Sequence, residues 1–152
     1  MSTASSLSNG FDWNVRVYYE DTDAGGVVFY ANYLKFFERA RTEWLRALGF
    51  QQHEMTATLG AMFVVRQTAV DYLSPARLDD ELRITVAVEK LRNASIAFVQ
   101  EAWRKPSDPS EPGGTGAGET LLATSRIVVV CVDAASFRPR GIPGPLLARL
   151  ER

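Results

Sequence analysis

Hydrophobic positions in the first third of the chain recur with the period of an α-helix. Between residues 31 and 48 the apolar side chains lie three or four positions apart, which predicts a long amphipathic helix that Gly49 ends as a C-cap. Charged residues fall on the opposite face, where they form either a solvated stripe or an interface. The apolar positions are Tyr33, Leu34, Phe37, Ala40, Trp44, Leu45 and Leu48, and the charged ones are Lys35, Glu38, Arg39, Arg41, Glu43 and Arg46.

Elsewhere the pattern is that of β-strands. The Trp-, Val- and Tyr-rich segment from Phe11 to about Glu20 predicts a first strand, and a short helical segment is predicted over 51–59. Stretches rich in β-branched and aromatic residues follow, and a short helix is predicted in the tail GIPGPLLARLER. These stretches are 61–73, 81–91, 94–105 and 120–133. The order predicts an α+β fold with one long central helix wrapped by an antiparallel sheet of about five strands.

Two segments have no apolar periodicity. Residues 1–10 are small and polar, which predicts a disordered tail before a single domain over 11–152. The segment PSDPSEPGGTGAG, residues 106–118, lies between two predicted strands that need to pair. It is therefore interpreted as a flexible hairpin loop and not as a linker between domains.

Composition narrows the chemistry. With 152 residues, 46% of them hydrophobic and 23% charged, we expect one globular domain, and a net charge of −1 gives no indication of a nucleic-acid partner. The single cysteine, Cys131, excludes an intramolecular disulfide and, with only one histidine, leaves no ligand set for a zinc site, so no metal site is predicted. The chain starts without the features of a signal peptide, and no apolar run approaches the ~20 residues of a transmembrane segment. A cytoplasmic location is predicted.

One predicted strand bears on assembly. Residues 127–132, IVVVCV, are apolar at every position, so both of their faces are expected to be buried. One helix covers only one face of a sheet. We therefore expect a second copy of the chain to cover the other face, in a homodimer.

An acidic cluster lies directly before the predicted helix, in EDTDAGGVVFYANY at residues 20–33. The first turn of a helix has unpaired N–H groups and a partial positive charge, which can stabilise the oxygen of a thioester carbonyl during attack. A carboxylate on the tight turn at Gly25 and Gly26 can face the carbonyl carbon, and a thiol of pKa ~8.5 leaves without a strong acid. This is sufficient for thioester hydrolysis. From the residues alone, a carboxylate that merely caps the turn is an equal alternative.

The same stretch belongs to a wider resemblance. RVYYEDTDAGGVVFYANYLKFFERARTEWL, FVVRQTAVDYLSPARLDDEL and VVVCVD are similar to the hotdog-fold acyl-CoA thioesterases of the 4-hydroxybenzoyl-CoA thioesterase superfamily. The similarity is greatest to the subgroup associated with the bacterial Tol–Pal cell-envelope system, and it runs from about Arg16 to Pro143. It implies a hotdog fold and hydrolysis of acyl-CoA to free acid and coenzyme A. No cofactor is implied, since coenzyme A is part of the substrate.

The resemblance also implies roles for residues. Asp23, the second aspartate of the D-x-D pair, is expected to be the catalytic carboxylate, as general base or as nucleophile. Glu20 and Asp21 are expected to serve in capping, turn hydrogen bonds or surface charge. Many members of the subgroup have histidine where this chain has Tyr30, which puts an Asp–His pair in doubt. The expected oxyanion and pocket residues are Tyr30, Ala31, Asn32 and Tyr33, and the expected coenzyme A-binding residues are Arg92, Ser95, Arg138 and Arg140.

Several alternatives stay open. Another hotdog branch uses a glutamate on the helix, which makes Glu38 the second candidate for the catalytic carboxylate. A hydratase is disfavoured because the only histidine, His53, lies away from the acidic cluster and is interpreted as a surface residue. Cys131 is interpreted as a buried thiol and not as a nucleophile. The alternative function is a non-catalytic module that binds acyl-CoA or acyl carrier protein and is linked to the cell envelope. The dimer that the apolar strand predicts is expected to have its active sites at the subunit boundary, and the resemblance adds a tetramer as a further expectation.

Overall fold

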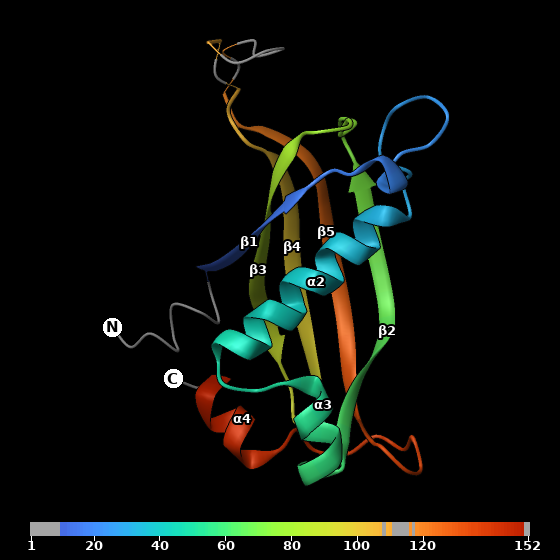
Figure 1. Cartoon of the computed structure of the whole chain (residues 1–152). Coiled ribbons are helices and arrows are strands. Elements are labelled where there is room, and N and C mark those ends of the chain that lie inside the picture. The colour runs from blue at the N-terminus through green and yellow to red at the C-terminus, as the bar shows by residue number, and fades with distance from the viewer. Residues whose placement is uncertain (1–9, 108, 111–115, 117, 151–152) are drawn as a thin grey trace.

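The chain folds as an antiparallel sheet curved around one long helix (Figure 1). The computed structural model describes residues 10–107, 109–110, 116 and 118–150. The strands are β1 (Phe11–Arg16), β2 (Ala61–Tyr72), β3 (Glu81–Leu91), β4 (Ser95–Arg104) and β5 (Thr120–Asp133). The helical elements are the 3₁₀ turn η1 (Tyr19–Asp21), α2 (Asn32–Ala47), the single turn α3 (Gln52–Glu54), the π-helical turn η2 (Met55–Leu59) and α4 (Gly144–Leu150).

The five strands lie in the order β1-β3-β4-β5-β2, and all neighbouring pairs are antiparallel. The two edges of the sheet are therefore β1 and β2. Helix α2 crosses one face of the sheet, while α3 and α4 lie at the end of the sheet away from the start of α2 (Figure 1). This is the α+β hotdog architecture that the sequence predicts. No helix in the described ranges is long and apolar enough to cross a membrane.

The first strand is shorter than predicted. It ends at Arg16 and not near Glu20. The following residues form η1, in which the Thr22 N–H donates to the carbonyl of Tyr19 (3.1 Å) and the Tyr18 N–H donates to Asp21 Oδ2 (2.9 Å). A carboxylate that accepts a nearby backbone N–H competes with strand pairing, which ends β1 early.

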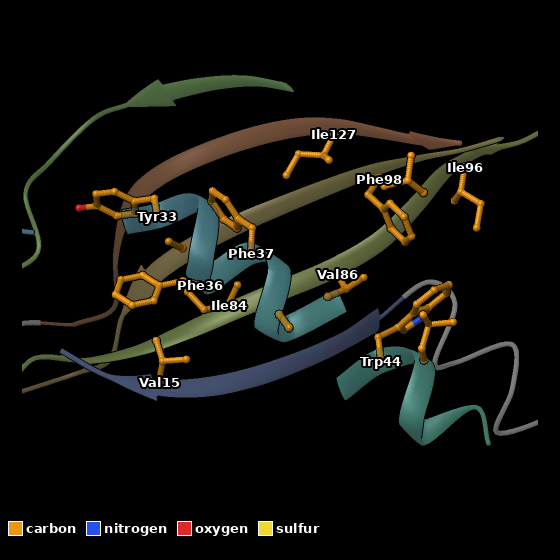
Figure 2. Packing of buried hydrophobic residues seen from close by; sticks show 14 of the residues in the cluster. Val15, Tyr33, Phe36, Phe37, Trp44, Ile84, Val86, Ile96, Phe98 and Ile127 are labelled. Atoms are coloured by element: carbon orange, nitrogen blue, oxygen red, sulfur yellow. The ribbon is translucent and has the colours of Figure 1, made fainter. Parts of the chain in front are cut away.

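The apolar face of helix α2 packs into the core, which the strands also build. Tyr33, Phe37, Ala40, Trp44 and Leu45 are buried as predicted, and Gly49, at φ 97°, ends the helix in the left-handed conformation expected of a C-cap. The interpretation of Leu34 as a core residue is wrong, because its side chain is 40% exposed. Figure 2 shows helix side chains packed towards the strands; Trp44 meets Phe98 of β4 edge to face, with ring centroids 5.1 Å apart.

Arg41 is not on a solvated stripe. Its guanidinium Nη1 donates to Gln100 Oε1 of β4 (2.9 Å), and the Gln100 amide nitrogen donates to the carbonyls of Phe37 (3.1 Å) and Thr85 (3.2 Å). Burial lowers the pKa of Arg41 to about 10, with Glu38 acting in the opposite direction. The helical spacing alone could not separate this arginine from its exposed neighbours, because its partner comes from a strand 59 residues further along the chain.

The apolar strand segment 127–132 is buried on both faces, as predicted. Its inward positions Ile127, Val129 and Cys131 join the core cluster, whereas its outward positions are buried outside that cluster. Val128 lies in the lining of a hollow whose other lining residues include long polar side chains, and Val132 pairs with Pro139. The chain thus buries its own outer face, and double burial does not by itself require a second copy.

The remaining predictions concern the connecting segments. The predicted helix over 51–59 is divided into α3 and η2, and the C-terminal helix is present as α4. Most of the predicted tail, residues 1–9, lies outside the described residues, as do 108, 111–115 and 117 within the predicted hairpin loop. On both sides of that loop β4 and β5 pair in antiparallel register, as a hairpin requires.

Candidate active site

The loop between η1 and α2 is fixed to the fold through a buried carboxylate. Asp21 is 4% exposed, and its Oδ1 accepts a hydrogen bond from the side-chain amide of Asn32 (2.6 Å), the first residue of α2. Its Oδ2 accepts the Tyr18 N–H, and its carbonyl accepts the Phe29 N–H (3.0 Å). The bonds from Asn32 and Phe29 connect the two ends of the loop, and the bond from Tyr18 closes the η1 turn. The prediction that Asp21 has a structural, hydrogen-bonding role is confirmed.

Asp23, only two residues further on, has an exposed side chain. The loop turns back on itself there, because the Asp23 N–H donates to the carbonyl of Val27 (2.9 Å) and the Gly26 N–H donates to the carbonyl of Asp23 (3.0 Å). Gly26 has a φ of 80°, which side chains other than glycine rarely adopt. The Asp23 Oδ1 accepts the Gly25 N–H (2.8 Å), whereas its Oδ2 has no partner among the described residues. One carboxylate oxygen is therefore free for chemistry.

The start of α2 presents fewer free amides than expected. The N–H groups of Asn32, Tyr33 and Leu34 donate to carbonyls of the preceding turn, at 2.8, 3.4 and 3.1 Å. The N–H groups of Tyr30 and Ala31, by contrast, have no acceptor in the described part of the chain. Of the residues expected to form an oxyanion site, Tyr30 and Ala31 thus offer backbone donors. Asn32 instead contributes its side chain, which holds Asp21.

A groove of about 250 Å³ lies beside the start of the helix. Tyr30, which is 63% exposed, lies on one side, and Tyr72 at the end of β2 contributes a second tyrosine ring 6.1 Å from that of Tyr30. Tyr33 is buried, its hydroxyl accepts the Ala76 N–H (3.1 Å), and burial raises its pKa. The groove is lined by Val28, Tyr30, Tyr33, Tyr72, Leu73, Ser74 and Pro75.

The predicted coenzyme A-binding residues Arg92 and Ser95 lie in a second hollow, of about 300 Å³. They follow β3 and begin β4, and the Arg92 N–H donates to the carbonyl of Ser95 (2.9 Å) across the turn between these strands. Three further basic residues line the hollow, and one of them, Arg126, pairs with Glu89 (2.8 Å). The full lining is Arg66, Gln67, Lys90, Arg92, Ser95, Ala97, Arg126 and Val128. Such a concentration of positive charge attracts phosphates.

Arg138 and Arg140 lie near the turn between β3 and β4, because the Ile142 N–H donates to the carbonyl of Asn93 (2.8 Å). Arg138 is exposed. The Arg140 guanidinium is already used by the fold, with Nη1 donating to the carbonyl of Leu59 (2.9 Å) and Nε to that of Gly141 (3.4 Å). Both arginines lie near Ala61, the first residue of β2. The 12 residues of β2 extend about 36 Å, so these arginines are far from the Tyr72 end of the same strand.

The other candidates lie away from the loop or lack the required exposure. Glu38 is exposed on α2. His53 is exposed on α3, at the opposite end of the sheet from the loop, which confirms its interpretation as a surface residue. Cys131 is fully buried, and burial raises the pKa of its thiol, which confirms the interpretation of an inert thiol.

Sequence reasoning missed Tyr72 and three basic residues of the hollow, Arg66, Lys90 and Arg126. All four residues lie on strands of the sheet. Only the pairing of the strands brings the three basic residues together. Gln67 pairs with Val128 after an irregularity in β2 that leaves Arg66 unpaired, and Lys90 pairs with Ala97 after a similar irregularity in β3. No local spacing could have shown this grouping, because it depends on two bulges.

Fold and site together define the class: an α+β hotdog protein with an exposed carboxylate and unpaired amides before its central helix. Residues 25–110 match the model of the thioesterase superfamily. The chain is 44% identical to the acyl-CoA thioester hydrolase YbgC of Escherichia coli O6:H1 over 142 residues, 93% of this chain and 96% of that protein. It is 42% identical to the acyl-CoA thioesterase YbgC of Haemophilus influenzae over 137 residues, 90% of this chain and 91% of that protein.

Solved structures agree. A probable thioesterase from Bartonella henselae is 31% identical, with a TM-score of 0.75 over 88% of this chain and 99% of that chain. A 1,4-dihydroxy-2-naphthoyl-CoA thioesterase from Synechocystis shares the fold at 19% identity, with a TM-score of 0.76 over 93% of this chain and 96% of that chain. The chain belongs to the thioesterase superfamily.

Proposed function

We propose that the chain hydrolyses acyl-CoA thioesters and that Asp23 is its catalytic carboxylate. The observation that carries the proposal is the contrast within one loop between the saturated Asp21 and the exposed Asp23, which keeps one carboxylate oxygen free. The unpaired N–H groups of Tyr30 and Ala31 lie on the same loop, as donors for the thioester oxygen. The curated names of the YbgC relatives support the same reaction.

Two routes fit these groups. In the first, the free Asp23 oxygen removes a proton from water as the water attacks the thioester carbon. In the second, the carboxylate attacks directly and forms a mixed anhydride, which water then hydrolyses. In both routes, the carbonyl oxygen becomes negatively charged and accepts hydrogen bonds from the free amides. Coenzyme A leaves as a thiolate, and because the pKa of a thiol is ~8.5, no strong acid is required. Neither route needs a cofactor or a metal.

The nucleotide end of the substrate is assigned to the basic hollow. Arg92 and Ser95, together with Arg66 and Lys90, offer a set of donors for phosphate groups in a space of about 300 Å³. Gln67, in the same lining, lies five residues before Tyr72, or about 17 Å along β2. The pantetheine arm therefore crosses the edge of β2 to reach the loop that holds Asp23.

The proposal includes a homodimer, which rests on the exposed edge of the sheet and not on the burial of residues 127–132. Strand β2 is a sheet edge of 12 residues, and large apolar side chains are exposed on it or next to it: Val65 is 53% exposed, Tyr72 45% and Leu73 57%. A long apolar edge is usually covered in solution. A second copy of the chain would cover it with the active sites at the boundary, and two such dimers would form the tetramer that the resemblance implies. Light scattering that shows a stable monomer at micromolar concentration would contradict this.

The setting of the reaction follows from the resemblance and belongs to the proposal. We place the protein in the cytoplasm, where acyl-CoA is available, with acyl carrier protein or Tol–Pal-related envelope proteins as further partners. Affinity capture from cells tests those partners. It compares a tagged copy of the protein with a tagged variant that lacks the surface arginines of the hollow.

The central experiment incubates the purified chain with a panel of acyl-CoAs and measures the release of free thiol. We expect release that requires Asp23. The alternative function, a module that binds acyl-CoA or acyl carrier protein without hydrolysis, gives binding of acyl-CoA and no thiol release from any member of the panel.

A further inference from the structure

Tyr72 lies at the end of β2, far from the acidic loop in sequence, yet it is bonded to the start of the helix. Its hydroxyl donates to the carbonyl of Tyr30 (3.0 Å), 42 residues earlier in the chain. Among the described residues, that carbonyl otherwise accepts only the Tyr33 N–H, at the longer distance of 3.4 Å. The Tyr72 ring is held between two others, with centroids 6.1 Å from Tyr30 and 5.4 Å from Tyr33. The hydroxyl is thus a well-placed donor and not a free surface group.

The accepting carbonyl and the unpaired Ala31 N–H belong to one peptide group. In a planar trans peptide the C=O and the N–H point in opposite directions, so a bond that holds the oxygen also fixes the direction of the hydrogen. A donor on the carbonyl further polarises the peptide, which strengthens its N–H as a donor. The weak 3.4 Å bond from Tyr33 would do this less effectively on its own.

We infer that Tyr72 is a positioning residue for hydrolysis, which aims and polarises the Ala31 N–H towards the thioester oxygen. This inference rests on the proposed function, because it needs a thioester carbonyl at the loop. It adds a residue that touches the site only through the Tyr30–Ala31 peptide. The free state of the Ala31 N–H and the bonded state of the Tyr30 carbonyl are the two observations that carry it.

The test compares Tyr72→Phe with wild type and with Tyr19→Phe. The phenylalanine keeps the ring that lines the groove and removes only the hydroxyl, while Tyr19 is 81% exposed and its hydroxyl has no partner among the described residues. We expect kcat to fall about tenfold in Tyr72→Phe with KM changed less than twofold, which is below the 10²–10³ lost with a whole oxyanion donor. The melting temperature and the kinetics of Tyr19→Phe should stay near wild type.

A spectroscopic measurement separates positioning from a structural role. Acyl-CoA labelled with ¹³C at the thioester carbonyl is bound to Asp23→Asn, and its infrared carbonyl band is compared with that of the free substrate. We expect a shift to lower frequency, and a smaller shift when Tyr72→Phe is added. A wild-type kcat in Tyr72→Phe, or a raised KM with an unchanged carbonyl band, would overturn the inference and leave the role of Asp23 intact. If Asp23→Asn itself turns over normally, the role of Asp23 fails, and the kcat ratio of Tyr72→Phe to wild type still decides the role of Tyr72.

Discussion

Asp21 and Asp23 are the same residue type two positions apart, and the fold treats them in opposite ways. Asp21 is 4% exposed and both of its carboxylate oxygens accept hydrogen bonds, one from a backbone N–H and one from the Asn32 amide. Asp23 is exposed and uses one oxygen to hold the Gly25 N–H. A carboxylate with both oxygens occupied and no solvent access cannot meet a substrate, whereas a half-occupied one at the surface can.

Two arginines expected to bind coenzyme A differ in the same way, since the fold already uses the side chain of one and leaves that of the other available. Arg140 donates to the carbonyls of Leu59 and Gly141, so its guanidinium holds backbone segments together. Arg92 has no side-chain partner in the described part of the chain and lines a hollow with other basic residues. Residue type marks a candidate, and the hydrogen bonds that the fold already uses decide which candidates remain available to a ligand.

The largest expected effect is on turnover, from Asp23→Asn. This change keeps the size of the side chain and can keep the bond to the Gly25 N–H, but it removes basicity and nucleophilicity. We expect kcat to fall at least ~10²-fold, the low end of what a positioned acid or base contributes. Thiol release under saturating acyl-CoA measures it, and acyl-CoA binding should be retained. If Asp23→Asn keeps near-normal turnover and Glu38→Gln has none, the carboxylate of the helix is the catalyst.

Asp21→Asn should affect stability more than rate. An asparagine at this position replaces one acceptor oxygen by an NH₂ group, which would face either the Tyr18 N–H or the Asn32 amide, so a buried donor loses its acceptor. We expect a loss of about 1–3 kcal/mol in the free energy of unfolding, measured by urea denaturation. Asp23→Asn is the matched control, because the same chemical change at an exposed position should cost less than about 0.5 kcal/mol. Equal losses in the two variants would remove the contrast.

Much of the fold could be predicted because the periodicity is local. The spacing of Phe37, Ala40 and Trp44 predicts the face of α2 that is buried, and Gly49 marks its end. Leu34, in the first turn of α2, fits the helical spacing but is 40% exposed, because spacing along a helix does not show whether another element covers a given position. The contact of Arg41 with the sheet could not be predicted from the helix alone, because Gln100, its partner, is supplied by β4.

The site was predictable only where its residues are neighbours in sequence. Asp21, Asp23 and the start of α2 lie in one stretch, so their grouping could be expected, but which carboxylate is buried depends on Asn32 and the Tyr18 N–H. The basic hollow combines Arg66, Lys90 and Arg126 from three strands. Its formation follows from strand register and bulges, which no single segment encodes.

A smaller effect is expected on substrate binding, from Arg92→Ala. A phosphate contact made equally in the ground state and the transition state changes KM and not kcat. We expect KM for acyl-CoA to rise about tenfold, or about 1.4 kcal/mol, with kcat within twofold of wild type. Hydrolysis of a truncated thioester without the nucleotide should not change, and Arg39→Ala, on the exposed face of α2, is the matched control. Equal losses on both substrates would make Arg92 a structural residue.

The smallest effect is expected from Arg140→Ala, and it should appear in stability. The Arg140 Nη1 bond to the carbonyl of Leu59 lies beside Gly60, whose φ of 64° reverses the chain between η2 and β2. Loss of this half-buried contact should cost about 1 kcal/mol in the free energy of unfolding, while KM for acyl-CoA changes less than twofold. A tenfold rise in KM without a loss of stability would return Arg140 to the coenzyme A site. Since Arg140 lies at the start of β2, about 36 Å along the strand from Tyr72, it would then have to serve the active site of a second copy of the chain.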